Sequence, residues 1–490
     1  MSCSRLLCAL LPLLASVALA CHDVHIDYER GERGEIVLYD DLYSVSTVDD
    51  KHAVAVGYYG AAYFTEDGGE TWTKGDTGTL RSLYNVSMGD AKHGWAIGQR
   101  GTVLRTEDGG RTWKRQPNLK EKEGAHLFAV TAIDKDRAFI VGEWGTRIYT
   151  ENGGKTWRDQ SFTIDENHSM FVWLSPKDQE RVRNDQKVYE DVGLNDIFCL
   201  GPPSTKCWLV GEFGYIYYSE DSGQTWQVGG IAGSVEMDPI KVPYNTLRVP
   251  DAYKPTLTEF AAAVKDESHL NVALEATASP EEIREFAGGD DPEELFEILE
   301  ARVQEVRTVL ENAGVSTDRI RLRGQPPWDY EDYLEDDPEF LQRYLDSRVA
   351  PSGGMRVRVI QNPVLFTVRF QDDENGLIAG LGGVVLSSND GGKTWDYQTM
   401  DRKQALFSVG ATGQRAVAIG EKGLVRFSSD AGQSWSEPET DAFPNVFTYM
   451  RDVSFDPSGR VGFIVGQTGQ ILRSTDAGHR WDHVLIRPEG

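Results

Sequence analysis

Short runs of alternating apolar and polar residues recur along most of the chain and predict β-strands. One run is Leu127–Val130, and the apolar run after it ends in the turn Val141-Gly142-Glu143-Trp144-Gly145. A third run leads into a recurring turn motif, and a fourth begins at the tryptophan of that motif. Period-two alternation with glycine-rich turns favours strands over helices. Four short strands in about 40 residues are typical of one blade of a β-propeller.

The recurring turn motif is [Ser/Thr]-x-[Asp/Asn]-x-Gly-x-x-Trp, which occurs seven times between Thr65 and Trp481. Its third position holds Asp67, Asp108, Asn152, Asp221, Asp390, Asp430 and Asp476. We expect this side chain to accept hydrogen bonds from backbone N–H groups of a tight turn, which an Asn oxygen can also do. The glycine allows backbone angles that a side chain would forbid, and the tryptophan covers the turn. The motif is therefore structural, and it predicts an all-β, seven-bladed propeller.

The strand order separates two ends of such a propeller. The turns between second and third strands share one end with the connections between blades, and the recurring motifs lie at the other end. Propeller function usually resides in the longer connections, so we expect the binding surface at the end that carries them. Candidate binding residues at these turns are Tyr58, Tyr59, Arg100, Glu143, Trp144, Glu212, Phe213, Glu421 and Lys422. Aromatic and charged residues suit protein recognition, although solvated turn residues without a partner are the alternative.

A long insertion separates the fourth and fifth repeats and has a different periodicity. Its sequence predicts strands at 269–276, 319–323 and 355–360, a helix over 292–313 and a short helix over 338–347. We therefore divide the chain into a leader (1–20), an N-terminal segment (21–41), blades 1–4 (42–229), an acidic α/β module (230–356) and blades 5–7 (357–490).

The first twenty residues resemble a secretory signal peptide. Arg5 precedes an apolar run that is too short to span a membrane and ends in Ala18-Leu19-Ala20. Export would place the chain in the periplasm or another oxidising compartment, where Cys199 and Cys207 could pair across a hairpin; two buried thiols are the alternative. Cys21 would be the first mature residue, and both acylation, as in a lipoprotein, and ordinary cleavage stay open.

Charge narrows the range of partners. The formal net charge is -27, which argues against nucleic acid, because phosphate contacts need a basic surface. Residues 234–355 hold 27 acidic and 12 basic residues, so more than half of the excess lies in the insertion. The propeller itself is only mildly acidic.

The motifs resemble the Asp-box, or BNR, repeats of sialidases and related propellers. Their combination with Gly-x-x-Gly turns is similar to the photosystem II assembly and stability factors, which implies a lumenal or periplasmic propeller that holds membrane-protein precursors. That family uses an arginine-rich patch, whereas arginines occur here only singly at repeat positions. Residues 301–324 weakly resemble OmpA-like domains, with Arg302 at the position of their peptidoglycan-binding arginine. The aspartate of that motif has no counterpart, so an acidic α/β excursion without peptidoglycan binding is the alternative.

The sequence offers no recognisable catalytic or metal-binding motif. It has no sialidase Phe-Arg-Ile-Pro element, H-E-x-x-H, Gly-x-Ser-x-Gly or P-loop. We expect no cofactor and no metal. The sequence therefore predicts a non-enzymatic scaffold or assembly factor for a membrane or envelope protein complex. A glycan-binding or glycoside-hydrolysing propeller is the alternative, because paired carboxylates cannot be recognised from sequence.

Overall fold

The structure is a computed structural model that describes residues 40–166, 176–232, 237, 240–266, 271–279, 281–282, 285, 293–322, 354–360, 363–400, 404–439 and 441–484. The leader, Cys21 and the helix expected at 338–347 lie outside the described residues.

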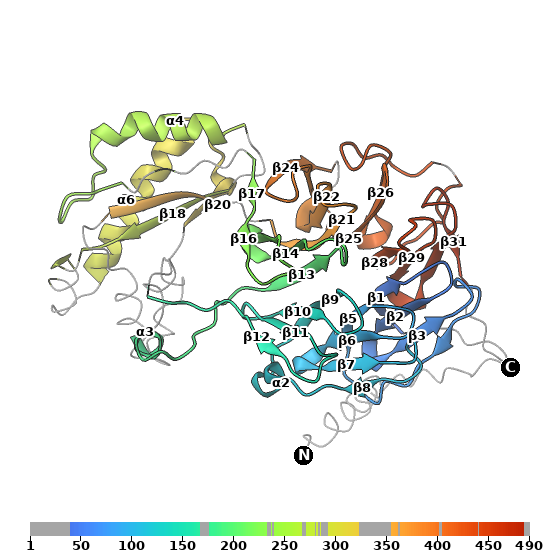
Figure 1. The fold of residues 1–490 in the computed structure, drawn as a ribbon. Helices are drawn as coiled ribbons and strands as arrows, with labels where there is room; N and C mark the ends of the chain where they lie inside the picture. The colour runs from blue at the N-terminus through green and yellow to red at the C-terminus, as the bar shows by residue number, and fades with distance from the viewer. Residues whose placement is uncertain are drawn as a thin grey trace, which may run out of the picture. The chain divides into compact units, whose positions relative to one another are not determined.

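The protein is a seven-bladed β-propeller, which confirms the predicted fold (Figure 1). The first four blades have four antiparallel strands each, numbered from the central channel outward. Blade 1 contains β1 (Leu42–Thr47), β2 (Ala53–Gly57), β3 (Ala62–Thr65) and β4 (Thr73–Lys74). Blade 2 contains β5 (Leu83–Met88), β6 (Gly94–Gly98), β7 (Val103–Thr106) and β8 (Lys114–Arg115). Blade 3 contains β9 (Leu127–Ala132), β10 (Ala138–Gly142), β11 (Arg147–Thr150) and β12 (Arg158–Asp159). Blade 4 contains β13 (Leu194–Cys199), β14 (Cys207–Gly211), β15 (Ile216–Ser219) and β16 (Gln227–Val228).

The last three blades follow the same order with small variations. Blade 5 contains β21 (Leu365–Phe370), β22 (Gly376–Gly380), β23 (Val384–Ser388) and β24 (Thr394–Thr399), and β17 (Gly230–Ile231) pairs in parallel with β24. Blade 6 contains β25 (Leu406–Thr412), β26 (Arg415–Gly420) and β27 (Val425–Ser428), and a bridge from Phe427 to Ser436 replaces the fourth strand. Blade 7 contains β28 (Met450–Phe455), β29 (Gly462–Gly466), β30 (Ile471–Ser474) and β31 (Asp482–His483). Short helices α2 (Leu119–Glu123) and α3 (Pro176–Arg183) lie in blade connections.

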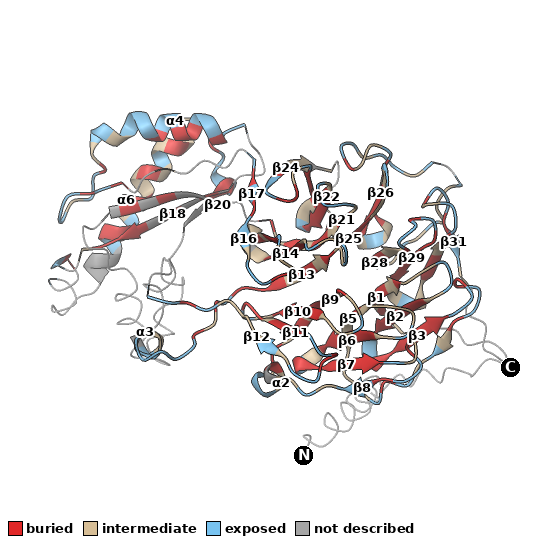
Figure 2. Cartoon of the chain, viewed as in Figure 1, coloured by how far each residue is buried: buried red, intermediate tan, exposed pale blue. Residues whose placement is uncertain are grey.

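The second strands form the core of the ring because neighbouring blades cover both of their faces. β2, β6, β10, β14, β22 and β29 are buried at every residue (Figure 2). Their apolar residues are not interrupted by polar ones, as expected for strands with no solvated face.

Each innermost strand carries a β-bulge at its second residue. In β1, Leu42 pairs with Gly57 and Ser44 pairs with Val56, so Tyr43 is left out of the register. The same shift occurs in β5, β9, β13, β21, β25 and β28. The bulge allows the second and third residues of each innermost strand to take separate roles around the channel.

The third residues bridge neighbouring blades. The channel-facing edge of an innermost strand has backbone N–H groups without a strand partner, and these need an acceptor. Val86 N donates to Ser44 Oγ of the preceding blade at 3.3 Å, and Val130 N donates to Asn85 Oδ1 at 3.0 Å. Equivalent bonds join Val368 N to Asp196 (2.9 Å), Val453 N to Ser408 (3.3 Å) and Val45 N to Asp452 (3.0 Å). We call these five bonds the upper tier.

The upper tier also closes the ring. Blades 1 and 7 are each made from one continuous segment, and among the described residues no strand is shared between the two ends of the propeller. Asp452 of blade 7 instead accepts from Val45 N and from Ser44 Oγ (2.8 Å) of blade 1. β31 supplies the fourth strand of blade 7, while residues 34–39, which could have added a strand there, lie outside the described residues.

The insertion forms a small α/β module with its own core. β18 (Asn271–Thr277) pairs in parallel with β19 (Ile320–Leu322) and antiparallel with β20 (Gly354–Ile360). The helix α6 (Glu293–Asn312) follows the predicted bounds closely, whereas α4 (Lys254–Val264) was not predicted; η5 (Asp251–Tyr253) and η6 (Thr317–Arg319) are single 3₁₀ turns. Leu257 and Phe260 of α4 share a core with Val303 and Val306 of α6.

We expect Asp452→Ala to lower the free energy of unfolding by about 3 kcal/mol, because it leaves Val45 N without its acceptor and Arg369 without one of its carboxylates. Asp452→Asn keeps one acceptor oxygen and should cost less. Urea unfolding of both variants measures the difference. Equal stability of the alanine variant and the wild-type protein would contradict the bridging role.

Candidate functional site

The turns between second and third strands lie at the entries of the innermost strands. In all seven blades the first N–H of this turn donates to the carbonyl just before the innermost strand, as Tyr58 N does to Asp41 O at 2.8 Å and Glu143 N to His126 O at 3.0 Å. The blade connections arrive at the same end. We call this end the connection face and the other end the Asp-box face.

Single 3₁₀ turns present the candidate binding residues. They are η1 (Tyr58–Gly60), η2 (Gln99–Gly101), η4 (Glu212–Gly214), η7 (Leu381–Gly383), η8 (Glu421–Gly423) and η9 (Gln467–Gly469), with an equivalent turn at 143–145. The second residue has a left-handed backbone at Tyr59, Arg100, Trp144 and Lys422, with φ between 50° and 55°. Such angles are uncommon for residues other than glycine and are maintained only where the surroundings fix the turn.

The three candidate glutamates have partners within their own blades. Glu143 accepts from His126 N at 2.7 Å, Glu212 from Gly193 N at 3.0 Å and Glu421 from Ala405 N at 3.3 Å. These carboxylates therefore fix the turn against the entry of the innermost strand. Partner contacts at the turns are left to the exposed second residues; the side chain of Phe213 is outside the described set.

Large apolar side chains are exposed on the connection face. Tyr58 is 44% exposed, Tyr59 61% and Trp144 42%. Three more exposed apolar residues were not among the predicted ones: Leu381 in η7, and Leu80 and Phe447 in blade connections, the last two being 80% and 84% exposed. Single connection residues carry no periodic signal, which is why the pattern did not reveal them.

Aromatic residues at the bulges surround the channel entrance on the same face. Tyr43 and Tyr84 lie 6.1 Å apart by ring centroids, and Phe366 and Phe407 lie 5.8 Å apart. The Arg451 guanidinium lies 4.8 Å from the Phe407 ring centroid. The second position of the innermost strands is aromatic in five blades, a signal that the sequence did contain.

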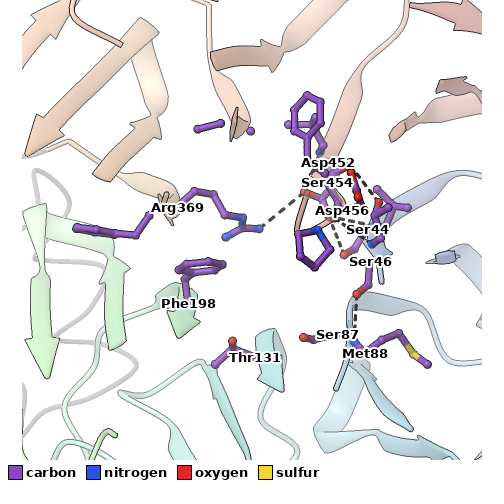
Figure 3. Close-up of a pocket in the computed structure, with 18 of the residues that line it drawn as sticks. Ser44, Ser46, Ser87, Met88, Thr131, Phe198, Arg369, Asp452, Ser454 and Asp456 are labelled. Carbon is purple, nitrogen blue, oxygen red and sulfur yellow. Dashed lines mark hydrogen bonds and ion pairs between the residues drawn. The ribbon is translucent and has the colours of Figure 1, made fainter. Parts of the chain in front are cut away.

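A pocket of about 530 Å³ occupies the channel toward the Asp-box face. Its lining residues come from the later halves of all seven innermost strands and from the turns that follow them. Arg369 reaches into it, with Nη1 2.5 Å from Asp196 and Nη2 3.9 Å from Asp452 (Figure 3). The Phe198 ring lies beneath the guanidinium, and the Cζ atom of Arg369 is 5.6 Å from the centroid of that ring.

Neighbouring charges shift the pKa values of Arg369 and Asp452. Burial acts to lower the pKa of Arg369, but the attraction of Asp196 and then of Asp452 outweighs it and raises that pKa. Burial raises the pKa of Asp452, against the opposing effects of Arg369 and of the donors Val45 and Ser44. The cluster is thus an internal ion-pair network that joins blades 4, 5 and 7.

The Asp-boxes repeat one hydrogen-bond pattern. Asp67 accepts from Thr65 Oγ1 (2.8 Å), Thr71 N (2.9 Å) and Thr71 Oγ1 (2.6 Å), and Thr65 Oγ1 in turn accepts from Gly69 N. The same arrangement surrounds Asp108, Asp221, Asp390 and Asp430. Asp476 differs because Arg480 takes the place of the hydroxyl residue and donates only its backbone N–H, at 3.0 Å. At Asn152 the side-chain amide instead donates to Thr156 Oγ1 at 2.8 Å. The Thr156 hydroxyl therefore accepts a hydrogen bond, whereas the equivalent Thr71 hydroxyl donates one to Asp67.

The Asp-box glycine allows close contact between blades. Gly392 has φ +84°, and a Cβ there would lie 2.6 Å from Trp208 Nε1 of blade 4. Trp208 Nε1 donates to Gly391 O at 2.7 Å. The box therefore fixes its own turn and also packs against the preceding blade.

Cys199 and Cys207 form a disulfide across the β13–β14 hairpin, where they are register partners. Arg302 of the module is buried and donates to Thr246 O, Thr277 O and Glu282. In the described part of the chain, no group of three His, Cys, Asp or Glu residues is arranged to hold a metal ion. No helix among those residues is long and apolar enough to cross a membrane.

Fold and repeats together define a BNR-type β-propeller with a closed ring and a polar channel. The family model described as "Photosynthesis system II assembly factor YCF48" matches residues 76–191 and 354–445. The resemblance to the photosystem II assembly and stability factors is thereby confirmed, and the chain is a distant homologue of that family.

Two relatives show how distant the homology is. The photosystem II assembly lipoprotein Ycf48 of Synechococcus sp. (strain CC9902) is 29% identical over 123 residues, which cover 24% of this chain and 35% of the relative. The photosystem II stability/assembly factor HCF136 of Arabidopsis thaliana is 29% identical over 127 residues, or 24% of this chain and 30% of the relative. The chain spans about a third of the length of these curated relatives.

Two solved structures align with most of this chain at low sequence identity. A structure described as YCF48 bound to D1 peptide aligns with a TM-score of 0.47 and 16% identity, covering 90% of this chain and 95% of that one. The WD40 propeller domain of Doa1 aligns with a TM-score of 0.45 and 8% identity, covering 91% and 97%.

Acid should weaken the Asp-boxes. Hydrogen bonds from Ser434 and Ser428 lower the pKa of Asp430 to about 2. Since this pKa lies below the usual value of 3.8, the contribution of Asp430 to stability is complete above about pH 4 and is lost as the pH falls toward 2. The stability difference between wild type and Asp430→Asn, measured by urea unfolding, should therefore shrink between pH 5 and about pH 2. A difference independent of pH would contradict the assignment.

Proposed function

We propose that the protein is a non-enzymatic scaffold that binds an extramembrane segment of an integral membrane protein through its connection face. The observation that carries the proposal is the gathering of exposed apolar side chains on that face, from turns and connections of several blades. Exposed aromatic residues next to polar turns are typical of protein-interaction surfaces.

The relatives support the class of partner. Both are named as photosystem II assembly factors, and one solved relative is described as bound to a peptide of D1. We propose by analogy that this chain attends the assembly of a membrane complex, and that photosystem II is its target if the organism is phototrophic.

We also propose that residues 1–20 direct export, with Cys21 as the acylated residue if the protein is a lipoprotein, as the Synechococcus relative is named. We expect the propeller to comprise residues 42–231 and 363–484, with the module between them, because β17 pairs with β24 of blade 5 and β20 pairs with β18 of the module.

The geometry gives less support to glycan hydrolysis. The two carboxylates that meet in the channel, Asp196 and Asp452, are both engaged by Arg369 and by backbone N–H groups. A glycosidase needs one carboxylic acid and one carboxylate facing the substrate. Peptidoglycan binding by the module is also weakly supported, since the guanidinium of Arg302 is already paired with Glu282.

The double variant Tyr59→Ala/Trp144→Ala tests the proposal. We expect affinity isolation from detergent-solubilised envelopes to recover an integral membrane protein with the wild type and at least about fivefold less with the variant, because central aromatic contacts carry much of the binding energy. Lys155→Ala/Arg460→Ala, which changes exposed residues at the Asp-box face, is the matched control and should recover the partner normally.

A photo-cross-linker at position 381 should label the same membrane protein. Equal recovery with both double variants, or labelling of soluble proteins alone, would overturn the proposal.

A further inference from the structure

A second, lower tier of bonds joins the innermost strands near the Asp-box face. Here the fifth residue of one strand accepts from the sixth N–H of the next. Ser46 Oγ accepts from Met88 N (3.0 Å), Ser87 Oγ from Ala132 N (2.9 Å) and Thr131 Oγ1 from Cys199 N (3.3 Å). Ser454 Oγ accepts from Thr47 N at 3.0 Å and continues this tier across the closure of the ring.

The lower tier is missing over one continuous arc. The fifth residues of blades 4, 5 and 6 are Phe198, Arg369 and Gly410, none of which has a hydroxyl acceptor. Within the described residues, Phe370 N, Ala411 N and Phe455 N therefore lack the bridging bond that the lower tier gives to their counterparts in the other blades. In the upper tier, Thr367 Oγ1 is buried without a partner at the junction of blades 5 and 6.

These three N–H groups belong to the pocket. Phe370, Ala411 and Phe455 all line it, together with Phe198, Arg369 and Gly410. By register they occupy non-hydrogen-bonded positions of their antiparallel pairs. A residue at such a position turns both its N–H and its C=O to the free edge of the strand. The arc therefore presents both N–H donors and C=O acceptors. An extended peptide main chain can pair with both kinds of group, whereas a simple anion can only accept.

The charge of the pocket lining indicates which ligands it can bind. The ionisable side chains that line the pocket are Asp196, Asp452, Asp456 and Arg369, an acidic excess. A carboxylate or phosphate would meet net repulsion, whereas a neutral or basic group would not. Figure 3 shows Arg369 and Phe198 on one side of the pocket and Ser44, Ser46 and Ser87 on the other. The volume of about 530 Å³ is that of an ordinary small-ligand site.

We infer that the channel pocket binds a short extended peptide segment, neutral or basic, whose main chain pairs with the unbridged arc of blades 5–7. The lining of this site includes turns at the Asp-box face, such as 456–459, and none of the exposed apolar residues of the connection face proposed above. The main-chain carbonyls of the peptide would take the place of the side-chain acceptors that blades 1, 2, 3 and 7 each provide to the next blade.

The test uses the full-length protein and a phage-displayed library of eight-residue peptides, followed by one synthetic peptide from the enriched set. Phe198→Ser and Phe198→Ala form a matched pair, since both remove the ring but only serine can bond Phe370 N, as Ser46 and Ser87 do for their neighbours. We expect the serine variant to bind the peptide about fivefold more weakly than the alanine variant, which corresponds to one lost hydrogen bond. Enriched peptides should be poor in Asp and Glu.

The location of the peptide provides a second readout. A benzophenone on the bound peptide should cross-link to residues of the pocket, such as those of 410–413 or 455–459. The double variant Tyr59→Ala/Trp144→Ala should bind the peptide normally, and Phe198→Ser should still recover the membrane partner, so failure of one site is distinguishable from failure of the other. Failure to enrich any peptide, equal affinity of the serine and alanine variants, mainly acidic peptides, or cross-links confined to the connection face would each overturn the inference.

Discussion

The unpaired edge of each innermost strand is the constraint on which the rest of this propeller depends. Every blade ends at the channel with backbone N–H groups that no strand of its own sheet can satisfy. The chain solves this by placing a short polar side chain on one blade under the N–H of the next, as Ser44, Asn85, Asp196, Ser408 and Asp452 do. The same bonds join blade 7 to blade 1, and among the described residues the ring closes through them without a shared strand.

Separation of roles between the two faces follows from this construction. On the Asp-box face, hydrogen-bonded turns and glycines lock each blade against its neighbour, as Gly392 does against Trp208. On the connection face, glutamates such as Glu143 fix the turns, and the exposed residues beside them remain available to a partner. The rigid positions are thus internal to the ring, while the apolar side chains that vary from blade to blade face solvent.

The sequence was sufficient to predict what is local and repeated. Seven Asp-boxes predicted seven blades, and the strand order placed Tyr59 and Trp144 on the connection face. The bridging tiers were not predicted, because they depend on which residue of one blade faces which N–H of the next, a relation between segments about 40 residues apart. A polar third position before a valine, as in Ser44-Val45 and Asp452-Val453, was the available signal. Helix α4 was missed because it is short and its apolar residues gather in the run 260–264 near its end rather than in a clear helical pattern. Exposed Phe447 and Leu80 belong to connections without periodicity.

Amide hydrogen exchange at the innermost strands tests the central claim most directly. The bridged amides of Val45, Val86, Val130, Val368 and Val453 should exchange slowly. Those of Phe370, Ala411 and Phe455, and that of Val409, to which Thr367 Oγ1 makes no bond in the upper tier, should exchange much faster although their strands are equally central in the ring. Uniform protection of all nine amides would contradict the claim that side-chain bridges between blades hold the ring and that their absence leaves an open arc.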